Sequence, residues 1–224
     1  MWQNADHLKE MLKKLELFKQ EIMKEINRLD KNDEAIVRTT VYPMAKVKPL
    51  EINGYPVFQF GYEGMLPLYK EDDYEYLSMI RHYYFRATFD AYDYSKLKLP
   101  AIERAVIIFV HYFKDDSIRD LDNRNKKYIQ DAIRQTRIIN SDSWQHVWNM
   151  DMAYKDKEKS HVQVYVVPQH HFTDFIQFLM DNHDTLKNGT KYLMKRSEYE
   201  AEYMKEKSLK ENSKYTAISD KTIW

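Results

Sequence analysis

Three aspartates and one lysine in the middle of the chain have residue types and spacing suited to metal-assisted chemistry on phosphate esters. Asp120 and Asp122 are separated by one residue, Lys126 follows four positions later, and Asp142 comes after a predicted helix. Residues two apart in extended backbone project to the same face, so both carboxylates of the pair can reach one ion. Mg²⁺ is usually held by a few carboxylates, waters and substrate phosphate, and a nearby lysine can assist the leaving oxygen. Asp120, Asp122, Asp142 and Lys126 therefore form a candidate phosphodiester-cleaving site.

These residues also have a purely structural interpretation. The run Asp120-Leu121-Asp122-Asn123 at a strand-to-helix junction fits ordinary turn and capping chemistry, and Lys126 fits an i,i+4 ion pair with Asp122. A calcium-binding EF-hand loop is excluded, because Arg124 would occupy its fifth position and Asn125 its sixth, where glycine is required. Residue types and spacing alone support a metal site and a structural cap about equally.

The elements around the acidic residues follow from hydrophobic patterning. Residues 105–113 form an apolar run rich in β-branched and aromatic side chains, which predicts a central strand covered on both faces. A helix is expected over 123–137 with Asp122 as its N-cap, and the short return after this helix is expected to bring Asp142 beside the aspartate pair. Two strands, at 144–154 and 161–167, are predicted to form a hairpin across a charged turn.

The earlier part of the chain predicts a helix and a β-rich segment. Apolar residues recur at heptad spacing over 7–29, which indicates an amphipathic helix that packs on its own domain or forms a coiled-coil dimer. Within the β-rich segment 36–60, Asn53-Gly54 is a hairpin turn signal. Glu71-Asp72-Asp73 predicts the first turn of a helix that ends near Asp90.

Together these elements predict a mixed α/β (α+β) fold, in which helices pack on a mixed β-sheet. A further helix is expected over 172–183. We expect an N-terminal amphipathic helix at 1–33, a core domain at 36–185 and a charged, helical or disordered tail at 186–224.

Composition limits the classes of function. The chain has 224 residues, 35 basic and 35 acidic side chains and no cysteine, so disulfides and thiolate chemistry are excluded. No run is apolar enough to span a membrane and no signal peptide is evident, which together with the missing cysteines favours a cytoplasmic protein. Because the net charge is zero, any affinity for nucleic acid has to come from a local arrangement of cations.

Several cations surround the acidic residues and are candidates for phosphate contacts. Arg119 precedes the first aspartate, and Arg124 and Lys127 flank the lysine of the site. Arg134 and Arg137 lie on the same predicted helix, where the solvated side of the helix is the better interpretation. We therefore expect Arg119, Arg124 and Lys127 to contact DNA, if the chain binds it.

The central segment resembles the RusA-type Holliday-junction resolvases. Members of that family carry an Asp-Leu-Asp-Asn block at the end of a buried strand and a lysine four residues after its second aspartate. A helix with an Asp-Ala-Leu-like step and a further aspartate in an acidic turn follow. In this chain the matching residues are Asp120-Leu121-Asp122-Asn123, Lys126, Asp131-Ala132-Ile133 and Asp142, and the resemblance is strong over about 107–167. The family's acidic turn has Ser141 here in place of one acid.

The resemblance implies a RusA-like core and a Mg²⁺-dependent endonuclease, with Mn²⁺ as a substitute ion, that cleaves four-way or otherwise branched DNA. Asp120, Asp122 and Asp142 would be the metal ligands and Lys126 the transition-state cation. A homodimer would suit the two-fold symmetry of a four-way junction, and no membrane partner or small-molecule cofactor is implied. The gene would be bacterial or carried by a phage or mobile element.

A second hypothesis from a different class is a non-catalytic DNA-binding or adaptor protein of phage or mobile-element type. In that case the nuclease core is retained as a scaffold, and the heptad helix and charged tail recruit partners. The zero net charge favours this hypothesis, and the complete set of three aspartates and one lysine opposes it.

Overall fold

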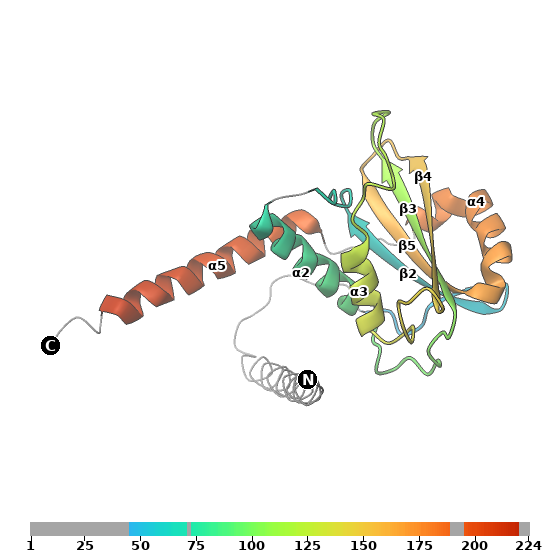
Figure 1. Cartoon of the computed structure of the whole chain (residues 1–224), viewed down its shortest axis with the longest axis horizontal. Helices are drawn as coiled ribbons and strands as arrows, with labels where there is room; N and C mark the ends of the chain where they lie inside the picture. Colours follow the sequence, from blue (N-terminus) through green and yellow to red (C-terminus); the bar gives the residue numbers. More distant parts are fainter. Residues whose placement is uncertain (1–44, 71–72, 189–194, 220–224) are drawn as a thin grey trace, which may run out of the picture. The chain divides into compact units, whose positions relative to one another are not determined.

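The computed structural model describes residues 45–70, 73–188 and 195–219, and its centre is a five-stranded sheet (Figure 1). The strand order is β1-β2-β5-β3-β4. β3 and β4 are parallel, whereas the other neighbouring strands are antiparallel, so the sheet is mixed as predicted. The strands are β1 (Leu50–Ile52), β2 (Tyr55–Glu63), β3 (Ala105–Phe113), β4 (Val147–Lys155) and β5 (His161–Pro168).

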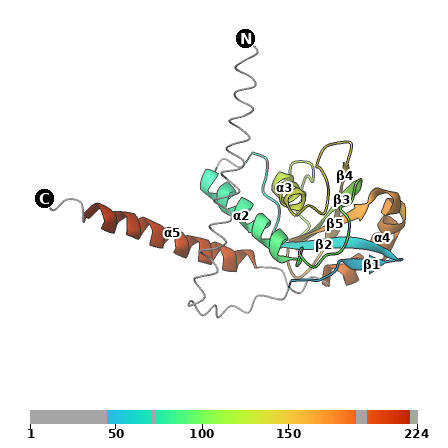
Figure 2. The same ribbon diagram turned by 90° about the horizontal axis from the view of Figure 1, so that it is seen from below.

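Helices cover both faces of the sheet, which gives three layers (Figures 1 and 2). The helices are α2 (Tyr74–Asp90), α3 (Lys127–Gln135), α4 (Phe172–Asn188) and α5 (Arg196–Ser219), with a short 3-10 turn (Gln169–His171) before α4. α2, α3 and the start of α5 share one apolar cluster with the sheet, and α4 packs on the opposite face in a second cluster. The predicted helix at 1–33 lies outside the described residues.

β3 is an inner strand of the sheet that is covered on both faces, as its sequence predicts. Every residue from Ala105 to Tyr112 is buried. Ile107 and Phe109 pack toward α2 and α3, whereas Ile108 and Val110 pack toward α4. The strand has no polar face because helices cover both of its sides.

The predicted hairpin at Asn53-Gly54 is confirmed. These two residues connect β1 to β2 with φ angles of 47° and 83°, the left-handed conformation that a tight two-residue hairpin turn requires. The helix predicted after the acidic run is present, but it begins at Tyr74, so Asp73 precedes the first turn as the N-cap and not as part of it. The carboxylate of Asp73 accepts hydrogen bonds from the backbone N–H groups of Glu75 and Tyr76, and Glu71 and Asp72 lie outside the described residues.

The predicted hairpin between the last two strands is wrong. β3 lies between β4 and β5 and pairs with both, so these two strands do not contact each other as a ladder. The turn after β4 passes around the end of β3, where the N–H of Asp156 donates to the carbonyl of Phe113. β3 is apolar on both faces and takes the inner position, and the more polar β4 becomes an edge strand.

The helix after the acidic motif begins later than predicted, at Lys127, and Asp122 is not its N-cap. Residues 123–125 pair instead with the segment that follows β2. Arg124 forms an isolated bridge with Leu68, and the N–H of Asn125 donates to the carbonyl of Pro67. This pairing keeps residues 123–125 out of the helix, although a propensity argument assigns them to it.

The start of α5 belongs to the packed part of the molecule. Tyr199 is buried against Tyr83 of α2, and the guanidinium of Arg196 donates to the hydroxyl of Tyr76. The backbone N–H of Arg196 also donates to the carboxylate of Glu63 at the end of β2. Among the described residues, no helix has the length and apolar character needed to cross a membrane.

Candidate functional site

The loop between β3 and α3 carries the Asp120 and Asp122 carboxylates. Both side chains are exposed, and neither has a hydrogen-bond or ion-pair partner in the described part of the chain. The loop itself is anchored by its neighbours: the carboxylate of Asp115 accepts from the N–H of Ser117 and from the guanidinium of Arg119. The aspartate pair therefore follows a part of the loop that is tied by internal contacts, and its oxygens are open to a ligand.

Lys126 reaches from the start of α3 to a polar group in the sheet. Its Nζ donates to Oδ2 of Asp151 at 2.8 Å, and Nε2 of His111 lies 3.4 Å from the other carboxylate oxygen. Asp151 lies in β4 opposite Phe109 of β3, and His111 is two residues further along β3. The lysine and Asp151 are largely buried, with 15% and 22% of their side chains exposed.

The electrostatics of this group favour the ionised carboxylate. Burial raises the pKa of Asp151, but the hydrogen bonds from His111 and Lys126, with the charge of the lysine, outweigh burial, and the pKa is lowered overall. Since an ionised carboxylate only accepts hydrogen bonds, the contact with His111 requires the tautomer protonated at Nε2. Asp151 therefore stays negatively charged at neutral pH and holds the ammonium beside it.

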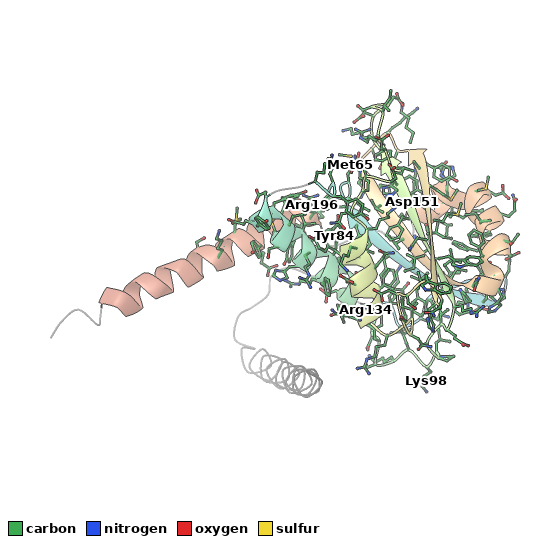
Figure 3. The ribbon with its side chains drawn as sticks, viewed as in Figure 1. Met65, Tyr84, Lys98, Arg134, Asp151 and Arg196 are labelled. Carbon is green, nitrogen blue, oxygen red and sulfur yellow. The ribbon has the colours of Figure 1, made fainter. Side chains whose placement is uncertain are left out.

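Asp142, the third predicted ligand, lies at the other end of the sheet. Because β3 and β4 are parallel, the chain between α3 and β4 returns to the start of β3, where Ile139 forms a bridge with Ile102. Asp142 precedes β4 at this end and forms an ion pair with Arg134 at 3.5 Å. In Figure 3, Arg134 lies toward the end of the sheet marked by Lys98, and Asp151 lies nearer the end marked by Met65.

The structure therefore brings Lys126 near Asp151 and separates Asp142 from Asp120 and Asp122. The short return after the helix, which the sequence predicted would bring Asp142 beside the pair, carries it away instead. Within residues 45–70, 73–188 and 195–219, no three His, Cys, Asp or Glu side chains are grouped closely enough to share a metal ion.

The three predicted DNA-contacting cations differ in their availability. Arg119 stacks on the ring of Phe113 and pairs with Asp115, so its guanidinium is engaged within the loop. Arg124 donates to the carbonyl of Leu66, and this hydrogen bond connects the loop before α3 to the segment after β2. Lys127 is the most exposed of the three, with 68% of its side chain accessible, and its ion pair with Asp131 is an ordinary i,i+4 contact.

Asp120 and Asp122 have the donor chemistry of a Mg²⁺ site. Mg²⁺ is commonly bound through one or two carboxylates, with waters and substrate phosphate filling the remaining positions. Asp120 and Asp122, exposed and without partners in the described part of the chain, are ligands of this type. A site of this kind would use these two side chains and would not need Asp142.

Sequence reasoning missed His111 and Asp151. Both carried a signal: His111 is the one histidine in the apolar run 105–113, and Asp151 occurs among alternating residues of the following strand. What the sequence did not reveal is that the two strands pair in parallel. That register places Asp151 beside the histidine and within reach of the lysine ammonium.

No protein-family model matches this chain, and no curated protein matches its sequence closely enough to indicate a relative.

Proposed function

We propose that this protein is a Mg²⁺-dependent endonuclease that cleaves four-way or otherwise branched DNA. The observation that carries the proposal is the pair Asp120 and Asp122, exposed and without internal partners, on the loop that follows the central strand β3. Lys126 follows a few residues later with its ammonium held in place. The resemblance of this segment to the RusA-type resolvases supports branched DNA as the substrate.

Each residue of the site has a distinct role in the proposed reaction. Asp120 and Asp122 would hold the ion, which when bound supplies a water of lowered pKa and stabilises charge on the phosphate. Lys126 is a cation suited to the negative charge that develops on the leaving oxygen. Lys127, exposed on the first turn of α3, is suited to a neighbouring backbone phosphate.

A homodimer is part of the proposal, because two copies related by a two-fold axis match the symmetry of a four-way junction. The zero net charge of the chain means that DNA binding depends on cations near the site. Affinity for branched DNA is therefore expected to fall steeply with salt, as it does wherever phosphate contacts dominate.

A non-catalytic DNA-binding or adaptor protein is the alternative, and two observations favour it. Asp142 is remote from the aspartate pair, and Arg119 and Arg124 use their guanidinium groups in internal contacts. A scaffold that has lost catalysis would show this separation and would bind branched DNA without cutting it.

The test is incubation of the purified protein with labelled four-way junction, Y-fork and linear duplex of matched sequence, with Mg²⁺, Mn²⁺ or EDTA. Paired nicks at symmetry-related positions of the junction, lost in EDTA, are the expected result. Binding of the junction without cleavage in either metal would replace the nuclease proposal with the adaptor proposal.

A further inference from the structure

Lys126 and Lys127 are neighbours in sequence with different surroundings. Lys127 is exposed and pairs with Asp131 one turn along its own helix. Lys126 is largely buried, and its ammonium crosses to β4 to donate to Asp151. Lys127 is therefore a surface residue, whereas the ammonium of Lys126 is held against the sheet.

The carboxylate that holds Lys126 is itself fixed by the core. Asp151 lies on β4, whose backbone is paired with β3 along its whole length. Its second oxygen accepts from Nε2 of His111, a residue that is 1% exposed. The backbone of Lys126 is also constrained, because its carbonyl accepts from the N–H of Gln130 and the preceding residue donates to Pro67.

We infer that Asp151 is a positioning residue for Lys126, held in turn by His111. This inference rests on the proposed nuclease function. A lysine side chain has a flexible four-carbon stem, and an ammonium that samples many positions stabilises the charge of a transition state poorly. Asp151 restricts it to one position, and because an ammonium has three N–H donors, the others stay available to a phosphate oxygen.

Cleavage of a four-way junction by a set of matched variants tests the inference. Asp151→Asn is expected to lower kcat by about 10- to 100-fold, the size of effect that misplacing a catalytic group produces, with KM nearly unchanged. Asp131→Asn removes a carboxylate that pairs with the neighbouring lysine and is expected to cleave at the wild-type rate. Asp151→Glu, which keeps the charge, is expected to recover most of the loss.

A double-mutant cycle separates positioning from a general structural effect. If Asp151 acts through Lys126, the variant carrying both Lys126→Gln and Asp151→Asn loses no more activity than Lys126→Gln alone. Losses that multiply in the double variant, or equal rates for Asp151→Asn and Asp131→Asn, would overturn the inference. So would a loss of cleavage in Asp142→Asn that Asp151→Asn does not show.

A readout that does not need cleavage distinguishes failure of the inference from failure of the proposed function. Reductive methylation followed by peptide mass spectrometry measures the reactivity of each lysine in the full chain. Lys126 is expected to react more slowly than Lys127 in the wild type and to speed up in Asp151→Asn, with Lys127 unchanged. If no DNA is cut but this pattern is found, the nuclease proposal fails, whereas the inference that Asp151 holds Lys126 stands. If Lys126 reacts equally in both proteins, the inference that Asp151 holds Lys126 is itself refuted.

Discussion

The carboxylate of Asp151, with His111 and Lys126, makes the stability of the folded protein depend on pH in the acidic range. Its pKa is lowered in the folded state, where hydrogen bonds from His111 and Lys126 outweigh burial. A carboxyl group of this kind stabilises the folded state above its unfolded pKa of about 4, and the contribution disappears as the pH falls through the lower folded value. Protonation therefore favours unfolding below about pH 4.

Replacement of this carboxylate is expected to change both the size and the pH dependence of stability. Asp151→Asn at pH 7 should lower the free energy of unfolding by about 1–3 kcal/mol, because it leaves the largely buried ammonium of Lys126 and the imidazole of His111 without their charged partner. Urea unfolding at several pH values is the measurement. The variant should lose less stability than the wild type between about pH 5 and pH 2, and parallel pH curves for the two proteins would contradict the assignment.

At the scale of elements, the β1–β2 hairpin depends on backbone conformation at its turn. Gly54 has a φ of 83° and no heavy atom within 4 Å of the position where a Cβ would lie, so a side chain there meets strain without a clash. Gly54→Ala is expected to destabilise the protein by about 1–2 kcal/mol in thermal or urea unfolding, from conformational cost alone. Gly54→Asn serves as the control, because asparagine tolerates the left-handed region, and an equal loss in both variants would rule out this explanation.

The strands and helices were predictable where local pattern decides them. The apolar run of β3, the Asn53-Gly54 turn and the acidic start of α2 were each evident from a few neighbouring residues. The pairing of the strands was not predictable in this way. β4 and β5 are close in sequence and resemble a hairpin, but β3 lies between them and pairs with both, which buries both of its apolar faces. Contacts of Arg124 and Asn125 with residues 66–68, which delay the start of α3, are equally invisible to local pattern.

The same limit explains what the sequence revealed of the candidate site. Asp120, Asp122 and Lys126 follow one another along the chain, so the sequence predicts their proximity from short-range spacing alone. The place of Asp142 depended on whether the chain returned to the same end of the sheet, and the parallel register of β3 and β4 sends it to the opposite end. His111 and Asp151 join the lysine through that register alone.

At the scale of the whole molecule, α5 contributes to the core through its first turns. Tyr199 is 8% exposed and packs on Tyr83, whereas Met204 is 56% exposed on the same helix. Tyr199→Ala is therefore expected to cost about 2–4 kcal/mol of unfolding free energy through the cavity that it leaves, and Met204→Ala less than about 0.5 kcal/mol. Equal effects of the two changes, measured by urea unfolding, would show that the helix does not pack on the domain in solution.

The central claim is that the aspartate pair after β3 supports metal-dependent cutting of branched DNA. Its most direct test is the single-turnover cleavage of a labelled four-way junction by the wild type and by Asp120→Asn, with Mg²⁺ and with EDTA. Because Asp120 is exposed and without a partner in the described chain, the variant should keep the stability of the wild type within about 0.5 kcal/mol and still bind the junction. Cleavage by the wild type in Mg²⁺, absent in EDTA and in Asp120→Asn, is the predicted result. Undiminished cleavage by Asp120→Asn would contradict the account.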